Sequence, residues 1–327
     1  MQVILSRDKW NQVARGQVLA IGNFDGVHLG HQALLGRARQ IADQKKVGLC
    51  VMTFDPHPVA ILKPEKSPGV LTPLEFKLRL LEKAKVDCVV VVRDNFDLLN
   101  LSPEDFIDRF LMVQLKPSAI VEGPSFTFGF GRSGNIETLK AIAATRGFDV
   151  EVVEPVHIAL KTASDAMVSS SLIRQLLENS AVEDASLCLS RPYRLIGQVE
   201  AGRGKGTELG FPTANLKPLK QIIPAEGVYA GNVLIGDTLE DVCNGSAKLP
   251  AAISIGRART FIAEHPLLLE AHILGQKTGP LYGKWMALDF IEFVRHQQRF
   301  ESVEKFKEQI AVDCARIENI LKINEIL

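Results

Sequence analysis

Residues 18–35, which read VLAIGNFDGVHLGHQALL, decide how the first half of the chain folds. The apolar run 18–21 predicts a buried strand, and the apolar spacing after His31 predicts a helix. Between them lies a turn with glycines, and His28 and His31 stand at the start of the helix. Free N–H groups and the helix dipole attract phosphate there, and glycines let a ligand approach the backbone. The stretch predicts a nucleotide phosphate site; the alternative is a strand–helix turn with surface histidines.

Composition limits the classes of protein to which the chain can belong. Its 327 residues suit two domains, and 46% apolar content is enough for a core in each. Lys plus Arg and Asp plus Glu both total 38, so we expect neither a nucleic acid nor a membrane as partner. No signal peptide is visible, no apolar run reaches the roughly 18 residues of a spanning helix, and the five cysteines are scattered. We expect a cytoplasmic protein with reduced thiols.

The first half alternates strand patterns with helix patterns. Strands are expected at 18–21, 49–54, 88–92, 119–121 and 150–153, and helices at 32–45, 74–83, 103–114 and 136–144. This order predicts an α/β fold with a doubly wound parallel sheet, covered on both faces. Ligands bind beyond the carboxyl ends of such strands. We therefore expect the segments 22–26, 53–58 and 122–129 to face one cleft.

A second phosphate candidate lies in Val168-Ser169-Ser170-Ser171-Leu172-Ile173-Arg174. Ser169 or Ser170 fits the cap of a helix N-terminus, and the fork of Arg174 suits phosphate oxygens. The alternative is simple capping beside a surface arginine. Zinc is not expected at His28 and His31, because their spacing differs from that of HExxH and no third soft ligand is evident.

The second half changes to short strands and ends in one long helix. Strands are expected at 195–200, 227–234, 251–255, 267–274 and 286–293, and a helix at 302–321. This pattern predicts a small antiparallel β-barrel with a terminal helix. We place the domains at residues 1–186 and 187–327.

The sharpest motif of the second half is GRGKGTELGFPTAN, residues 202–215. Its glycines allow backbone N–H groups to surround an anion, and Thr213 and Asn215 offer neutral oxygens for Mg²⁺ or phosphate. The alternative is a flexible hairpin with an asparagine turn.

The motifs GNFDGVHLGH, FDPHP, SFTFGFGRSG and SSSLIR occur in an order that resembles bacterial bifunctional riboflavin kinase/FMN adenylyltransferases (FAD synthetases), within the nucleotidyltransferase superfamily. GFPTAN and PAEGVYAG resemble the riboflavin kinase signature. The resemblance covers nearly the whole chain. It implies a transferase that phosphorylates riboflavin to FMN and then adenylylates FMN to FAD with release of pyrophosphate. ATP is the co-substrate, and Mg²⁺ is required.

The resemblance assigns roles in the adenylyltransferase half. His28 and His31 would bind the ATP phosphates and stabilise charge during attack on the α-phosphorus, and Asn23 and Asp25 would help to place the nucleotide or Mg²⁺. The full nucleotide and phosphate set is Gly22, Asn23, Phe24, Asp25, His28, Gly30, His31, Ser169, Ser170 and Arg174. The flavin set is Pro56, His57, Pro58, Phe126 and Phe128.

In the kinase half, the resemblance makes Glu270 the general base for the ribityl 5′-hydroxyl. A carboxylate between apolar neighbours is unusual without a function; the alternative is an outward-facing edge residue. Tyr282 and Arg295 would contact the flavin, and Thr213 and Asn215 would hold Mg²⁺. The ATP set is Gly202, Gly206, Gly210, Phe211, Pro212, Thr213 and Asn215.

Some positions depart from the family pattern. They are Ser125, Thr127, Thr207, Arg259 and the pair Gly275-Gln276. The departures at Thr127, Thr207 and Gly275-Gln276 motivate one alternative, a riboflavin kinase with a weakened adenylyltransferase module. A separate alternative is a flavin or nucleotide sensor without turnover. The expected partners are riboflavin, FMN and ATP, and an oligomer is possible but not required.

Overall fold

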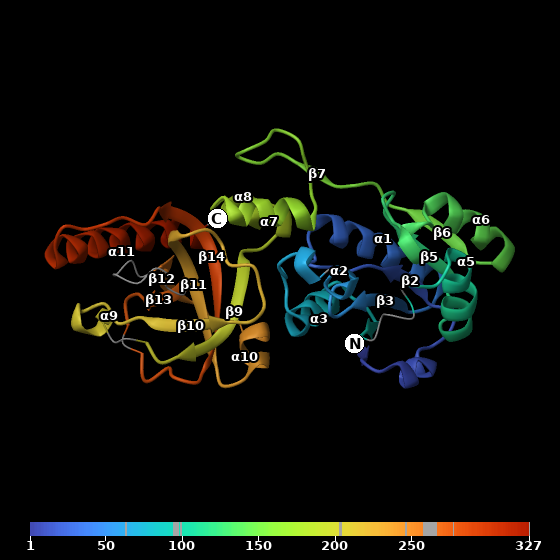
Figure 1. The fold of residues 1–327 in the computed structure, drawn as a ribbon, viewed down its shortest axis with the longest axis horizontal. Helices are drawn as coiled ribbons and strands as arrows, with labels where there is room; N and C mark the ends of the chain where they lie inside the picture. The colour runs from blue at the N-terminus through green and yellow to red at the C-terminus, as the bar shows by residue number, and fades with distance from the viewer. Residues whose placement is uncertain are drawn as a thin grey trace. The chain divides into compact units, whose positions relative to one another are not determined.

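The computed structural model describes residues 1–62, 64–93, 98, 100–202, 205–245, 247–257, 267–276 and 278–326. The departure at Arg259 lies outside this part of the chain. Two compact units emerge: Met1–Pro68, Phe76–Ile158 and Asp165–Val168 form the first, and Gly69–Glu75, Ala159–Ser164 and Ser169–Leu327 form the second (Figure 1). The domain boundary at residue 186 stays a prediction.

The first unit is built on a six-stranded, wholly parallel sheet, as the alternating pattern predicted. The strand order is β1-β4-β3-β2-β5-β6, so the direction of winding reverses between β2 and β5. The three-residue β1 was not predicted, because so short a run carries no periodicity. The strands are β1 Gln2–Ile4, β2 Val18–Ile21, β3 Leu49–Phe54, β4 Cys88–Val92, β5 Ala119–Glu122 and β6 Asp149–Val152.

Both faces of this sheet are buried. Every residue of β2 and β4 is buried, which explains why these strands are continuous apolar runs rather than alternating ones. One face packs on a core that includes Phe106, Phe110 and Leu139, and α1 packs against β2, β3 and β5. The helices are α1 Leu29–Lys45, α2 Pro58–Leu62, α3 Leu74–Lys83, α5 Pro103–Asp105 continued by a π-helix Phe106–Met112, and α6 Ile136–Arg146. Shorter elements are the 3₁₀ turns Arg7–Gln12, Pro64–Lys66 and Phe130–Arg132, and the paired strands β7 His157–Ile158 and β8 Ala166–Met167.

The second unit contains a closed antiparallel barrel, as predicted. The strand order around it is β10-β13-β12-β11-β14-β9. The strand β10 was not predicted, because its short sequence ANLKP mixes polar residues with a proline. The strands are β9 Tyr193–Glu200, β10 Ala214–Pro218, β11 Gly227–Gly236, β12 Leu249–Arg257, β13 Leu267–Ile273 and β14 Trp285–Arg295.

Alternate residues of the barrel strands fill its interior. Ala251, Ile253 and Ile255 of β12, for example, are fully buried. The helix α11, Val303–Ile326, packs on the outside of the barrel through Ile317 and Leu321. The other helices of this unit are α7 Ser170–Glu178, α8 Val182–Leu189, α9 Lys205–Glu208 and α10 Leu239–Asn244. Within the described part of the chain, no helix is both long enough and apolar enough to cross a membrane.

Candidate active sites

The turn after β2 brings the two histidines of the opening motif into contact. His28 is the N-cap of α1, and its Nδ1 accepts a hydrogen bond from the His31 N–H at 3.4 Å. The two rings stack with their centroids 3.7 Å apart. A Cβ on Gly30 would lie 3.2 Å from His28 Cε1, so a glycine there leaves room for the ring. The helix therefore begins after His28, and the two imidazoles lie together at its mouth.

The backbone of this turn is strained. Phe24 and Val27 both have positive φ, 45° and 41°, in the region that favours glycine. For a β-branched residue such as Val27, this conformation costs about 1–3 kcal/mol. Strain of this kind gathers at functional sites, where the surrounding structure holds it in place. The strained backbone thus indicates that this turn has a function beyond joining β2 to α1.

His31 lies in an environment that disfavours its charged form. Burial lowers its pKa well below 6.5, and the nearby groups His28 and Lys77 lower it further. Its Nδ1 is buried and has no hydrogen-bond partner in the structure. Nδ1 of His28 accepts from the His31 N–H and therefore does not carry a proton in this contact. The mouth of α1 thus presents imidazole rather than imidazolium at His31.

The ends of the neighbouring strands β2, β3 and β5 converge on this turn, and the cleft expected there stays a prediction. Asn23 Nδ2 lies 3.0 Å from His57 Nε2, and His57 Nδ1 accepts from the Val59 N–H at 3.1 Å. From β5, Glu122 Oε1 accepts from the Ile21 N–H at 2.6 Å. The segments that begin with Gly22 and Thr53 and the end of β5 therefore meet at one edge of the sheet.

Two buried ionisable residues of this region were not singled out as site residues by the sequence analysis. Lys77 is 6% exposed, and its Nζ donates to Asn23 O at 2.8 Å. Glu122 is 4% exposed, and burial raises its pKa well above 4.5. The helical spacing of Lys77 with Leu80 and Leu81, both buried, was the signal that could have identified the lysine. Glu122 is the last residue of β5 and the first of the segment 122–129 that was expected at the cleft, but its burial was not predicted.

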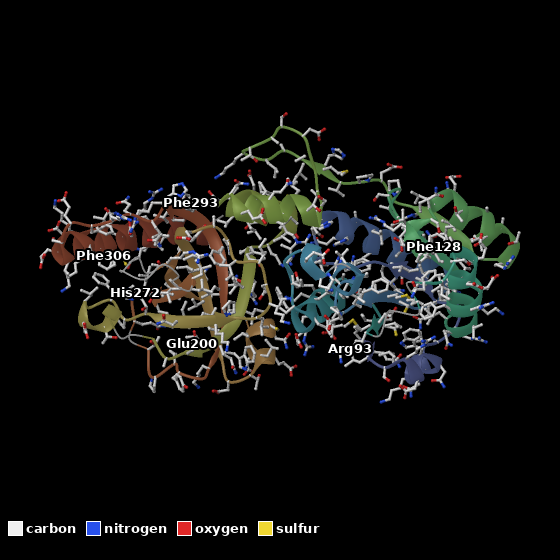
Figure 2. All side chains as sticks on the ribbon, in the orientation of Figure 1. Arg93, Phe128, Glu200, His272, Phe293 and Phe306 are labelled. Carbon is white, nitrogen blue, oxygen red and sulfur yellow. The ribbon has the colours of Figure 1, made fainter. Side chains whose placement is uncertain are left out.

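Phe126 and Phe128, which were expected to bind the flavin, lie against each other. Their ring centroids are 5.5 Å apart, and Phe128, which is labelled in Figure 2, is only 7% exposed and also packs on Phe106. Their assignment to the flavin stays a prediction, and the structure gives Phe128 a packing role. Beside them, Arg132 Nε donates to Thr127 Oγ1 at 2.8 Å.

The SSSLIR segment belongs to the second compact unit. Ser169 caps α7, with its Oγ accepting from the Leu172 N–H at 3.2 Å, which confirms the capping prediction. Arg174 Nε donates to Gly69 O at 2.7 Å. Because His28 and His31 lie in the first unit, the assignment of these residues to the same nucleotide stays a prediction.

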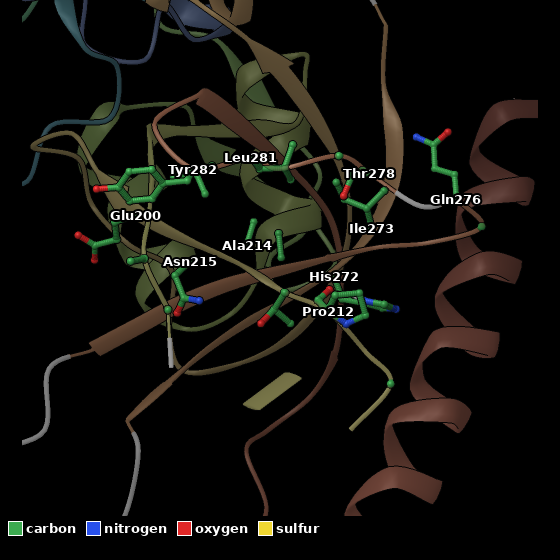
Figure 3. A pocket seen from close by; sticks show the side chains of 18 residues that line it. Glu200, Pro212, Ala214, Asn215, His272, Ile273, Gln276, Thr278, Leu281 and Tyr282 are labelled. Carbon is green, nitrogen blue, oxygen red and sulfur yellow. Dashed lines mark hydrogen bonds between the residues drawn. The ribbon is translucent and has the colours of Figure 1, made fainter. Parts of the chain in front are cut away.

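A cavity of about 850 Å³ opens between β9, β10 and β13 of the barrel (Figure 3). Several predicted residues line it: Gly202, Gly210, Pro212, Thr213, Asn215 and Tyr282. The sequence analysis missed Glu200 and His272, which also line it. His272 Nδ1 lies 2.8 Å from Pro212 O and so fixes the GFPTAN segment. A cavity of this size accommodates a nucleotide-sized ligand.

The strand register places Glu270 beside the GFPTAN motif. Asn215 of β10 pairs directly with Glu270 of β13 on one side and with Glu200 of β9 on the other. Directly paired residues project from the same face of a sheet, with Cβ atoms about 4.5–5.5 Å apart. β13 lies between β10 and β12, so Glu270 is not an edge residue, and it is half-buried. This pairing brings a carboxylate and an amide together.

The glycine-rich loop is closed on itself. The Phe211 N–H donates to Gly206 O at 2.8 Å, and Gly210 has φ 88°. A Cβ on Gly206 would lie 2.5 Å from Phe211 O, which no real side chain tolerates. The loop therefore requires glycine at position 206 for a close approach of backbone to backbone.

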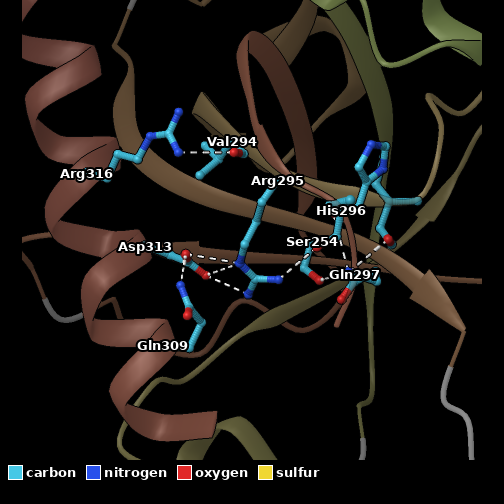
Figure 4. A network of polar contacts seen from close by, with 10 residues as sticks. Ser254, Val294, Arg295, His296, Gln297, Gln309, Asp313 and Arg316 are labelled. Atoms are coloured by element: carbon cyan, nitrogen blue, oxygen red, sulfur yellow. Dashed lines mark hydrogen bonds and ion pairs between the residues drawn. The ribbon is translucent and has the colours of Figure 1, made fainter. Parts of the chain in front are cut away.

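The two predicted flavin contacts of the barrel differ in their surroundings. Tyr282 lines the cavity and is 74% exposed, so its ring is available to a ligand. Arg295 instead forms an ion pair with Asp313 of α11 (Figure 4). Its role toward a flavin stays a prediction, and the structure gives it a role in holding α11.

The chemistry of the barrel site fits Mg²⁺ that arrives with a nucleotide. Among the described residues, no group of three or more His, Cys, Asp or Glu side chains could hold a metal by itself. Thr213 and Asn215 supply neutral oxygens, and Mg²⁺ characteristically takes few protein ligands and completes its shell with phosphates and water. The side chains present therefore fit a metal shared with ATP.

Comparison with known proteins identifies the family. Residues 10–171 match the FAD synthetase family model, and residues 189–321 match the riboflavin kinase family model. A bifunctional riboflavin kinase/FMN adenylyltransferase of Listeria monocytogenes is 35% identical over 311 residues, 94% of this chain and 93% of the relative. The chain belongs to the bifunctional riboflavin kinase/FMN adenylyltransferase family. The Escherichia coli K12 member is 34% identical over 91% of this chain and 90% of its own.

A solved structure has the same fold over the whole length. It is the crystal structure of a macrolide-efflux protein from Streptococcus pneumoniae, with a TM-score of 0.83 and 25% identity over 98% of this chain and 99% of that one. Its name refers to efflux, which is said of that protein alone. The predicted arrangement, a parallel-sheet unit followed by a closed barrel and a terminal helix, is confirmed.

Proposed function

We propose that this chain makes FAD from riboflavin in two transfers that use separate sites. The barrel transfers the γ-phosphoryl group of ATP to riboflavin, and the parallel-sheet unit transfers AMP from a second ATP to the FMN formed. Family membership over more than nine-tenths of the chain supports both activities. The single observation that carries the first is the direct pairing of Asn215 with Glu270 beside the GFPTAN loop.

In the barrel, Glu270 accepts the proton of the ribityl 5′-hydroxyl as its oxygen attacks the γ-phosphorus. The new O–P bond forms while the bond to the ADP oxygen breaks, so the products are FMN and ADP. Thr213 and Asn215 hold Mg²⁺, which supplies neutralisation of phosphate charge when bound. The closed glycine loop approaches the phosphates through its backbone N–H groups.

In the parallel-sheet unit, an FMN phosphate oxygen attacks the α-phosphorus of ATP, and pyrophosphate leaves. No side chain forms a covalent bond in this step, so the protein contributes position and electrostatic stabilisation. The stacked pair His28 and His31 at the mouth of α1 supports this assignment. We further propose that Ser169, Ser170 and Arg174 bind the departing phosphates and that the enzyme acts in the cytoplasm.

A flavin assay tests the proposal. The purified chain is incubated with riboflavin, ATP and Mg²⁺, and the flavins are separated over time. FMN should appear first and FAD later, with pyrophosphate equal to FAD. FMN without FAD would leave a single-activity kinase, and tight flavin binding without consumption of ATP would indicate a sensor; either result overturns the two-step proposal.

A further inference from the structure

Lys77 is a buried cation that no motif of the sequence explains. Its side chain comes from α3, and the residue is 6% exposed. Lysines are almost never buried to this extent unless their charge is compensated, because removing an ammonium group from water costs several kcal/mol. A lysine in this position therefore needs partners that justify its burial.

The ammonium group fixes the turn that follows β2. Lys77 Nζ donates to Asn23 O at 2.8 Å, and Thr53 Oγ1 donates to the same carbonyl oxygen at 3.1 Å. Two donors from different elements thus hold one peptide of the turn whose backbone is strained at Phe24. Movement of α3 or β3 would be transmitted to the position of Asn23.

Charged and titratable groups face Lys77 from three further elements. Asp25 lies in the turn after β2, Asp55 follows β3, and His31 lies in the first turn of α1. Burial lowers the pKa of Lys77, whereas Asp25 and Asp55 raise it. The positive charge in turn lowers the pKa of His31, after burial and together with His28.

We propose that Lys77 is a positioning residue of the adenylyl-transfer site, which fixes the turn carrying Asn23 and Asp25 and places a positive charge beside His31. The inference rests on the proposed adenylylation of FMN. In this arrangement His31 is a neutral imidazole, and the buried ammonium group of Lys77 holds the turn in place before the nucleotide binds. Such preorganisation is what electrostatic catalysis of phosphoryl chemistry requires.

Two variants separate the charge of Lys77 from its hydrogen bond, and a third serves as the control. Lys77→Met removes both, and Lys77→Gln removes the charge but keeps a donor for Asn23 O. Lys83→Met is the matched control, because Lys83 is an exposed lysine on the same helix. For each protein, kcat and KM are measured for FMN adenylylation and, on the same preparation, for riboflavin phosphorylation.

The second readout is the titration of the His31 ring, followed by NMR and assigned with a His31→Gln variant. In Lys77→Met we expect kcat for adenylylation to fall about 10- to 100-fold, as for other groups that orient a catalytic residue. In Lys77→Gln the loss of adenylylation kcat should be smaller. In both variants the His31 pKa should rise, and the kcat for riboflavin phosphorylation should not change. In Lys83→Met both activities and the His31 pKa should equal those of the wild type.

Several results would overturn the inference. An unchanged adenylylation kcat in Lys77→Met, an unmoved His31 titration, or an equal loss of both activities would make Lys77 structural at most. If the wild-type chain forms no FAD, the proposed function fails instead. The His31 titration then still decides whether Lys77 places its charge beside that ring.

Discussion

Arg295 of β14 and Asp313 of α11 form a nearly buried ion pair, with Arg295 Nη2 2.6 Å from Asp313 Oδ2 and side-chain exposures of 13% and 7%. Arg295 Nε lies within hydrogen-bonding distance of both carboxylate oxygens, and Gln309 Nε2 donates to Oδ1 at 2.9 Å. The contact fastens the last helix to the outside of the barrel (Figure 4). Asp313 lies one helical turn before Ile317, which packs on the barrel. The ion pair and this apolar contact together hold α11 against the barrel.

Substitution of Asp313 should loosen that helix. In Asp313→Ala, Arg295 is left buried without its partner, and breaking such a pair costs about 3–5 kcal/mol. We expect a lower thermal unfolding midpoint for the barrel unit, measured by calorimetry. Glu301→Gln is the control, because the Glu301–Lys305 pair is exposed and contributes little. An equal effect of the two substitutions would contradict the assigned importance of the pair.

Glu270→Gln should separate the two activities. The amide keeps the shape of the side chain but cannot accept the hydroxyl proton, so riboflavin phosphorylation should fall about 10²–10⁴-fold. Adenylylation of supplied FMN should continue at the wild-type rate, because the proposed adenylyl-transfer site does not include Glu270. The two rates are followed by flavin chromatography, and Glu308→Gln on α11 serves as the control. Retention of FMN formation would exclude Glu270 as the base.

His28→Asn tests whether His28 is more than a helix cap. Asparagine is among the best N-cap residues, so α1 should keep its stability, whereas His28→Ala loses a cap and about 0.5–2 kcal/mol. Both variants should lose FAD formation and keep FMN formation. Wild-type FAD formation in the asparagine variant would show that capping alone explains His28.

Stability at high pH should depend on Glu122. Burial raises the pKa of this carboxyl above 4.5, so the folded state holds the proton that the unfolded state releases. Stability is therefore fully present below the unfolded pKa near 4.5 and is lost as the pH rises toward the folded pKa, by about 1.4 kcal/mol per pH unit. Glu122→Gln removes this loss and keeps an acceptor for the Ile21 N–H. Its unfolding midpoint should exceed that of the wild type at pH 8 but not at pH 5.

Glu137→Gln is the matched control for this comparison, because Glu137 has a side-chain exposure of 80%. The midpoints are measured by calorimetry across the pH range. Parallel pH curves for wild type and Glu122→Gln would show that Glu122 is ionised in the folded protein.

Much of the fold could be predicted because its strands and helices carry strong local patterns. The continuous apolar runs of β2, β3 and β4 identify a sheet covered on both faces, and the three- and four-residue steps of α11 identify a long helix. β1 and β10 were not predicted, because a strand of three residues, or one that contains polar residues and proline, has no such pattern. They form only where neighbouring strands supply their hydrogen bonds.

The candidate site divides in the same way. His28, His31 and Asn215 stand in compact motifs, so their sequence neighbours reveal them. Lys77 and Glu122 become parts of the site only through the packing of α3 and β5, and burial of a charged residue is a tertiary property. Arg295 was singled out for a flavin contact, but its ion pair with Asp313 could not be predicted, because Asp313 comes from a helix that follows later in the chain.

The edge strands of the two sheets determine whether another chain can add a strand to them. In the described part of the second unit every barrel strand has two neighbours, so the barrel itself presents no unpaired strand to another chain. The parallel sheet ends in β1 and β6, of three and four residues. Short edges of this kind are poor templates for the strand-to-strand addition that begins aggregation. The barrel and the parallel sheet therefore give little opportunity for a second copy of the chain to add a strand.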